Sequence, residues 1–261
     1  MQALLAQIAP PAEPAANAAR AAEVVAAHPE ADLIVSPELF LSGYNLARAR
    51  ETAVNLDGPE LARVRAAAQA AGTSVIVGEW RGAAVANAVA CIDERGELAA
   101  VCRKLCLFGS GANVFEAGVE LVIAELGGRR VGPLICFDIE FPETAQALAA
   151  ADADLLVTAA ANMEPFFGDH VIASRARTLD NRLPHLYVNR TGSERGLEFV
   201  GGTCALAADG TVVAEVEGRG EAELRTEVAA PGMDDERIDY LAQVPRERQV
   251  RTRTTTRGAS R

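Results

Sequence analysis

Residues 129–143, RRVGPLICFDIEFPE, constrain the fold more than any other stretch of this sequence. The apolar run 131–135 is too short for a helix and stops at Cys136, which predicts a buried strand followed by a turn. Pro142 suits the first turn of a helix, and Glu143 suits the positive end of the helix dipole. The stretch therefore predicts a strand, a turn that carries Cys136, and then a helix.

Cys136 has two interpretations at this position. A thiol on a strand-to-helix turn is exposed and can have a lowered pKa, which would make it a nucleophile. The alternative is a structural role, because the chain has five cysteines and free cysteines are often simply buried. This stretch alone leaves both interpretations open.

Short apolar runs alternate with helical stretches early in the chain, and pairs of strands without helices follow later. Helices are expected at 13–27, 59–71, 142–150 and 171–182. Strands are expected at 3–8, 32–35, 75–77, 85–92, 98–102, 121–125, 130–135, 155–158, 185–189, 203–207, 212–216 and 221–228, and a turn at 189–192. This pattern predicts an α/β fold with mixed sheets covered by helices.

Length and composition favour an ordinary globular enzyme. The 261 residues fit one large α/β domain or two small ones. The apolar runs are too short or too charged to cross a bilayer, and the N-terminal MQALLAQIAPP lacks the basic region of a signal peptide. Because the five cysteines have no disulfide-framework spacing, we expect a cytoplasmic protein without membrane contact.

Charge is distributed unevenly along the chain. The net charge is −11, although residues 246–261 contain six Arg and one Glu. The acidic body argues against nucleic-acid binding. The basic end could bind an anion, but such ends are more often disordered. We expect one domain at 1–245 and a disordered basic tail at 246–261.

Lys104 is the only lysine among 25 basic residues, and the other 24 are arginine. Lysine is a compact ammonium with a tunable pKa, and arginine cannot replace it where that property matters. One interpretation is therefore that Lys104 has a specific role. The other is that this lysine was retained by chance.

Three chemically active residues follow the ends of predicted strands, namely Glu38, Lys104 and Cys136. Ligands of open α/β sheets bind outside the carboxyl ends of strands. Here Glu38 can act as general base, and Cys136 can attack an amide carbonyl to form a thioester. Lys104 can stabilise the developing oxyanion, with the backbone N–H of Phe137 as a second donor. The three residues predict an acyl-transfer site.

The segments around these residues resemble the nitrilase superfamily of carbon–nitrogen hydrolases. The resemblance covers about residues 1–230 and rests on SPELFLSGYN, CRKLCLF and ICFDIEFPE, with support from RARTLDNRLPHLYVNRTG and FVGGT. It implies a four-layer αββα sandwich, a Glu38–Lys104–Cys136 triad, no metal or organic cofactor, and a homodimer or larger homo-oligomer. The sequence around Glu38 and Cys136 is most similar to that of short bacterial aliphatic amidases, which implies a small-molecule amide substrate.

The sequence departs from the family pattern at two places. Cys106 stands where the family commonly has histidine, and residues 109–115 lack the family's second acid. In the family that acid helps to position the substrate and the lysine. Ser110 or Asn113 could partly replace it by hydrogen bonding, and Glu140 is another nearby acid. Reduced or altered activity is one consequence of this departure.

Further pocket residues are expected in the loops near the triad. Glu140 faces either the substrate or a salt-bridge partner, and Tyr44 either lines the pocket or packs in the core. Asn162, Met163 and Phe166 follow the strand after Cys136, so their loop is expected to shape the substrate site, with a core position as the alternative for Met163 and Phe166. We therefore expect Phe137, Glu140, Tyr44 and Asn162 to bind substrate.

Other site chemistries are less well supported. Cys102 and Cys106 have a C-x-x-x-C spacing, but no further metal ligands lie near them in the sequence. A Cys/His protease would require His28, His170 or His185 as the base. His28 and His185 are expected to be structural, whereas His170 opens a helix near the expected pocket.

Two hypotheses for function follow. The first is an amidase that hydrolyses a small amide or N-carbamoyl compound to acid and ammonia, with a nitrile as a chemically possible substrate. The second is a nitrilase-like protein that binds a ligand and turns over poorly, because its second acid is missing.

Overall fold

The computed structural model describes residues 1–11, 13–81 and 85–229. Two six-stranded mixed sheets lie face to face. The first has the order β14-β1-β2-β3-β4-β5, with bounds Ala222–Glu227, Gln2–Gln7, Leu33–Val35, Ser74–Arg81, Val85–Ile92 and Leu98–Arg103. The second has the order β13-β12-β9-β8-β7-β6, with bounds Val212–Glu215, Cys204–Leu206, His185–Asn189, Leu155–Ala160, Arg129–Ile135 and Ala124–Leu126.

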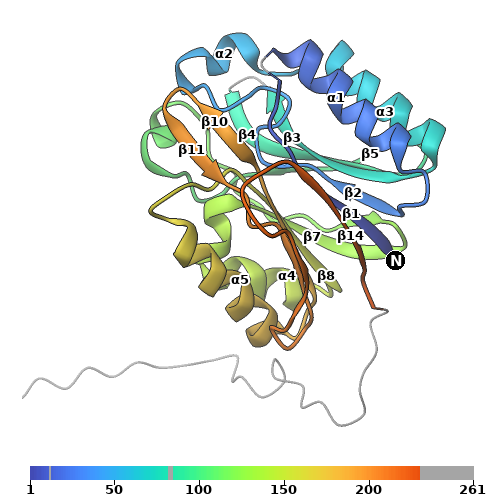
Figure 1. The fold of residues 1–261 in the computed structure, drawn as a ribbon, viewed down its shortest axis with the longest axis vertical. Coiled ribbons are helices and arrows are strands. Elements are labelled where there is room, and N and C mark those ends of the chain that lie inside the picture. The colour runs from blue at the N-terminus through green and yellow to red at the C-terminus, as the bar shows by residue number, and fades with distance from the viewer. Residues whose placement is uncertain (12, 82–84, 230–261) are drawn as a thin grey trace, which may run out of the picture.

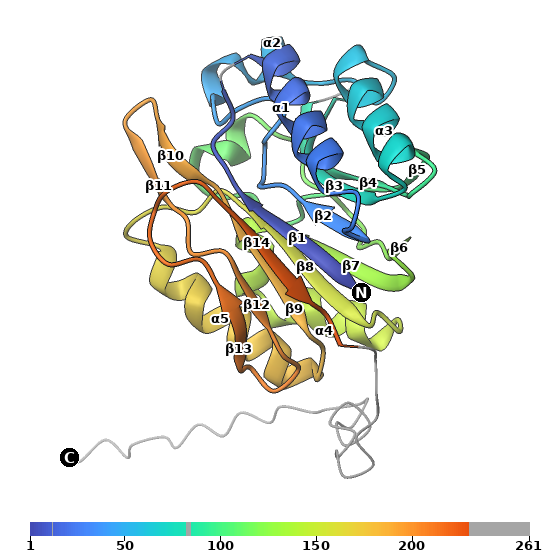
Figure 2. The ribbon, with the colours of Figure 1, turned by 45° about the vertical axis from the view of Figure 1, so that its right-hand side comes forward.

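Helices cover the outer face of each sheet (Figures 1 and 2). The first sheet carries α1, Pro14–Ala27, and α3, Pro59–Ala71; the second carries α4, Pro142–Ala150, and α5, Phe167–Asn181. The short helix α2, Ala49–Thr52, lies beyond these layers. Proline occupies the first turn of α1, α3 and α4, as helix starts favour. This architecture confirms the predicted αββα sandwich.

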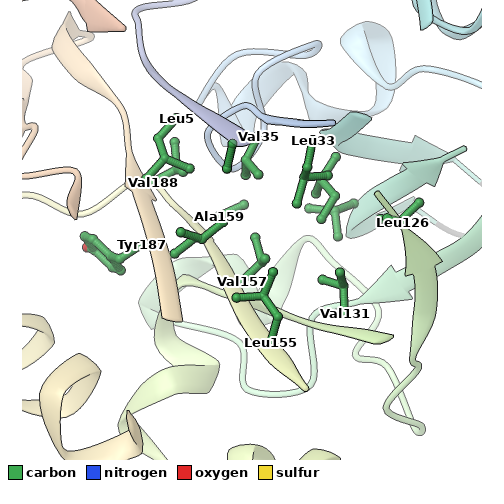
Figure 3. Packing of buried hydrophobic residues seen from close by; sticks show 14 of the residues in the cluster. Leu5, Leu33, Val35, Leu126, Val131, Leu155, Val157, Ala159, Tyr187 and Val188 are labelled. Atoms are coloured by element: carbon green, nitrogen blue, oxygen red, sulfur yellow. The ribbon is translucent and has the colours of Figure 1, made fainter. Parts of the chain in front are cut away.

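Alternate residues of the strands explain why four layers form. In β1, Leu4 packs with the residues of α1 and α3, whereas Leu5 belongs to the core between the sheets. In β8, Leu156 packs with α4, and Leu155 and Val157 face the other sheet. Figure 3 shows this inner core. Because successive side chains point to opposite faces, a strand that is apolar throughout must be covered on both sides.

The strands that precede the site run in the same direction within each sheet. β1, β2 and β3 are parallel, and β5 runs with β3 because each is antiparallel to β4. In the second sheet, β7, β8 and β9 are parallel. The loops after β2, β5, β7 and β8 therefore leave from the carboxyl ends of the strands, where a ligand site is expected.

Some sequence expectations differ from the structure. The expected turn at 189–192 is instead the start of an unpredicted hairpin, with β10 at Thr191–Glu194 and β11 at Leu197–Val200. Its two-residue turn, Arg195 and Gly196, has positive φ at both positions, which is typical of a type I′ turn. Arginine is uncommon at the first of these positions, so the sequence lacked the usual hairpin signal.

Two smaller boundaries also shift. The helix expected from residue 171 begins at Phe167, and the strand expected at 121–125 is reduced to β6 at 124–126. The predicted domain end at 245 and the tail 246–261 lie outside the described residues. None of the helices in the described ranges combines the length and apolar character that a membrane span requires.

Candidate active site

Glu38 lies beyond the end of β2 with a side chain that is only 1% exposed. The residue after it, Leu39, has a left-handed backbone with φ of 51°, so the chain turns sharply there. Gly78 of β3 lies directly against this turn. A Cβ atom on Gly78 would come within 2.5 Å of the Leu39 nitrogen, so a side chain at position 78 would displace the base.

The carboxylate of Glu38 is held by three hydrogen bonds. Its Oε1 accepts from Lys104 Nζ at 2.6 Å and from Asn87 Nδ2 at 2.7 Å. Its Oε2 accepts from the backbone N–H of Ala161 at 2.9 Å. Asn87 is on β4 and Ala161 follows β8, so both sheets contribute to holding this one group. Asn87 was not predicted, because the residues around an asparagine within an apolar strand carry no signal of its distant partner.

Lys104 and Glu38 form a buried ion pair. Burial alone would raise the pKa of Glu38, but the charge and hydrogen bond of Lys104, with the hydrogen bonds from Asn87 and Cys136, bring it below its ordinary value. Burial alone would lower the pKa of Lys104, but Glu38 and Cys136 raise it above its ordinary value. The structure therefore holds a carboxylate and an ammonium at neutral pH.

Cys136 follows β7 and opens the 3₁₀ turn η3, Cys136–Glu140, before α4. Its φ of 47° is in the left-handed region, which costs a non-glycine residue on the order of 1–3 kcal/mol and is common at active sites. The strand–turn–helix prediction is confirmed. The strained turn directs the thiol toward Glu38, with which it hydrogen bonds.

The expectation of an exposed Cys136 with a lowered pKa is wrong. Cys136 is buried, with 9% of its surface exposed. Burial and then the charge of Glu38 raise the pKa of its thiol, and they outweigh Lys104 and the N–H of Ala161, which lower it. Cys136 is therefore a protonated thiol beside a carboxylate, and such a thiol needs a general base in order to react as a nucleophile.

Asp138 joins the cysteine turn to the lysine loop, and the sequence analysis did not identify it. Its Oδ1 accepts from the backbone N–H groups of Cys106 at 2.7 Å and Leu105 at 3.2 Å, and its Oδ2 accepts from Ile135 N–H at 3.1 Å. Burial raises its pKa to about 6 despite these bonds. The position of an acid two residues after Cys136 was visible, but its partners across the fold were not.

A pocket opens over Cys136 and Lys104. Its lining also includes Tyr44, Phe108, Phe137, Glu140, Ala161, Asn162, Met163, Phe166 and His170. The structure thus brings all four predicted substrate residues to one pocket with the thiol and the ammonium. Glu38 lies behind Lys104 and Cys136, from where it reaches both. Phe108 was not expected at the pocket, whereas Phe166 was expected either there or in the core, and His170 was expected near it.

The loop that lacks the second acid forms the 3₁₀ turn η2, Gly109–Asn113. Ser110 and Asn113 are exposed on it, so neither is placed to replace the missing carboxylate. Glu140 instead faces the pocket, where its Oε1 lies 3.4 Å from His170 Nε2. Lys104 acts on the pKa of Glu140, so this acid lies within electrostatic range of the Lys104 ammonium.

The alternative chemistries lose support from the geometry. His185 is buried against Thr158 Oγ1 at 2.8 Å, and His28 pairs with Glu223 at 2.8 Å. His170 lines the pocket, but its Nδ1 contacts the Tyr187 hydroxyl at 2.9 Å. Cys102 is buried and donates to the carbonyl of Pro133. Among the described residues, no three His, Cys, Asp or Glu side chains are grouped to hold a metal ion.

Comparison with known proteins agrees with this geometry. The model of the carbon–nitrogen hydrolase family matches residues 3–230. The chain belongs to this family. It is also 38% identical over 211 residues to the hydrolase in the pqqF 5′ region of Pseudomonas protegens, which covers 78% of this chain and 74% of that protein.

Two amidases are also similar. An (R)-stereoselective amidase of a Pseudomonas species is 34% identical over 215 residues, which is 81% of this chain and 78% of that protein. The crystal structure of an amidase from a Nesterenkonia species matches with a TM-score of 0.83 and 27% identity, over 94% of this chain and 93% of that one. These matches confirm the resemblance to the nitrilase superfamily and its fold.

Proposed function

We propose that the protein is an amidase that hydrolyses a small amide or N-carbamoyl compound to acid and ammonia through a thioester on Cys136. The observation that carries the proposal is the 2.6 Å ion pair between Lys104 and Glu38, with the Cys136 thiol hydrogen-bonded to the same carboxylate at an open pocket. A base, a cation and a nucleophile in contact are the components that acyl transfer requires.

In the first half-reaction, Glu38 takes the thiol proton as the Cys136 sulfur bonds to the carbonyl carbon. Lys104, which stays charged, and the predicted N–H donor of Phe137 stabilise the oxyanion. The C–N bond then breaks, the proton on Glu38 passes to the leaving nitrogen, and ammonia departs. The raised pKa of Cys136 supports this order, because the thiol becomes a nucleophile only as its proton is transferred.

In the second half-reaction, Glu38 removes a proton from a water molecule that attacks the thioester. The C–S bond breaks, the acid leaves, and the thiolate recovers the proton from Glu38. A relative supports a covalent cysteine route: structures of a glutamate-to-glutamine mutant of the Nesterenkonia amidase show Michael addition of acrylamide, and addition of the acetamide moiety of fluoroacetamide, at its active-site cysteine.

The test is ammonia release from a panel of short aliphatic amides, N-carbamoyl amines and amino-acid amides, with matching nitriles. Wild type should release ammonia, Cys136→Ala should not, and Cys106→Ala is the matched control because Cys106 is the half-buried neighbour of the site. No release from any amide, with folding shown by circular dichroism, would instead favour the binding protein. Release from nitriles alone would favour a nitrilase.

Alkylation gives an independent test of the nucleophile. Iodoacetamide should label Cys136 first, because its thiol lies at the pocket beside a carboxylate base. Burial raises the pKa of all five thiols, Cys136 included, so the expected selectivity rests on the pocket and on the Glu38 base and not on the resting pKa. Peptide mapping that finds another cysteine labelled first would overturn the assignment, and Glu38→Gln should slow the labelling of Cys136.

A further inference from the structure

Glu140 gives the pocket a negative charge, and no Lys or Arg among the described residues forms an ion pair with it, although Lys104 acts on it from a distance. Its side chain is 26% exposed and lines the pocket beside Cys136. The cation in this pocket, Lys104, is already paired with Glu38. His170, 3.4 Å from Glu140, is neutral at pH 7, since burial lowers its pKa to about 4. Asp169 is close enough to raise the pKa of Glu140, so it adds negative rather than positive charge.

Three aromatic rings line the same pocket as this carboxylate. The rings of Phe108 and Phe137 lie edge to face with centroids 5.2 Å apart, and those of Phe108 and Phe166 with centroids 5.0 Å apart. All three line the pocket with Glu140, and Phe166 is 38% exposed. The faces of aromatic rings attract cations, including ammonium groups of ligands.

We propose that this pocket selects amides whose acyl group carries a protonated amine, such as amino-acid amides. The ammonium would lie between Glu140 and the rings of Phe108, Phe137 and Phe166, while the carboxamide reaches Cys136. An acyl group with a carboxylate would meet the negative charge of Glu140 and be disfavoured. The proposal rests on the amidase activity proposed above and adds the class of substrate to it.

A series of near-isosteric amides tests the selection: β-alaninamide, butyramide and succinamate differ mainly in the charge at the far end of the acyl chain. Wild type should hydrolyse β-alaninamide with a kcat/KM about tenfold above that for butyramide, the size expected for a partly desolvated cation–π and carboxylate contact. Succinamate should fall below butyramide. Equal values, or a preference for succinamate, would overturn the proposal.

Variants are compared by the ratio of kcat/KM for β-alaninamide to that for butyramide, so that a general loss of activity cancels. Glu140→Gln should bring the ratio close to one. Glu143→Gln is the matched control, because it removes the same charge three residues away at an exposed position outside the pocket lining. Phe166→Leu keeps an apolar side chain but removes a ring, and should lower the ratio severalfold.

Binding separates this proposal from the proposed activity. Cys136→Ala protein can be titrated with the three amides and followed by calorimetry or ligand-observed NMR, which need no turnover. Tighter binding of β-alaninamide than of butyramide would support the proposed selectivity even if wild type hydrolysed none of the amides. That combination would overturn only the proposal of amidase activity. Hydrolysis of butyramide without any preference for β-alaninamide in binding or turnover would overturn the selection alone.

Discussion

Replacement of Lys104 by arginine is the sharpest test of the site, since it keeps the positive charge and changes its shape. Lys104 is 4% exposed and places Nζ 2.6 Å from Glu38 Oε1. A planar guanidinium is larger than an ammonium and cannot occupy the same point between Glu38 and the pocket. The extra atoms should cost about 1–3 kcal/mol of stability, as overpacking of a core does.

The effect on catalysis should be larger than the effect on stability. A displaced cation no longer faces the oxyanion, and the loss of one such donor lowers kcat by about 10²–10³-fold, or about 3–4 kcal/mol in the barrier. Lys104→Arg should therefore lower kcat/KM by at least about a hundredfold. Lys104→Met removes the charge as well, so Glu38 should lose its depressed pKa and its role as base at neutral pH.

Steady-state ammonia release and urea unfolding measure the two effects separately. The control is Arg103→Lys, a conservative cation exchange at the neighbouring position, where Arg103 forms a half-exposed pair with Glu116 at 3.4 Å. This control should stay close to wild type in both assays. Turnover by folded Lys104→Arg within about threefold of wild type would refute the argument that a compact ammonium is required.

Two further changes probe groups that hold the site. Asn87→Leu removes the 2.7 Å hydrogen bond to Glu38 and should raise the pKa of Glu38, because that hydrogen bond favours the charged form. Since Glu38 works as a carboxylate, the loss of activity at low pH should begin at a higher pH, and an unshifted pH profile of kcat/KM would contradict this. Asp138 has its pKa raised from 3.8 to about 6 by burial, so its stabilising contribution is complete below pH 3.8 and is lost as the pH rises through about 6. Asp138→Asn lacks this titration, so urea unfolding should show wild type more favoured over the variant at pH 4 than at pH 7, by about 2 kcal/mol. A difference that is independent of pH would count against this prediction.

The fold was largely predictable because its signals are local. Most strands could be read from short apolar runs, and β4 at Val85–Ile92 and β9 at His185–Asn189 match their predicted bounds. The helix α3 ends at Gly72, whose φ of 67° suits glycine. The hairpin around Arg195 and Gly196 was missed, since its turn requires positive φ at both residues and arginine is not a residue typical of that conformation.

The site was predictable only in part, for a related reason. Cys136 could be placed on a strand-to-helix turn because the residues on both sides of it set that turn. The raised pKa of its thiol could not be predicted, because the pKa depends on burial between two sheets and on the charge of Glu38. Each of these influences comes from residues distant in the chain.

The sequence by itself determined which chemical groups are available and which elements carry them: a carboxyl, a single lysine and a thiol, each at the end of a strand. Only the tertiary structure decided how those groups act. Asn87 and the N–H of Ala161 hold the base, Gly78 makes room for it, and Glu140 faces the pocket beside aromatic rings. Local propensity acts over a few neighbouring residues, whereas hydrogen bonding, burial and charge act between residues that only the packing of the two sheets brings together.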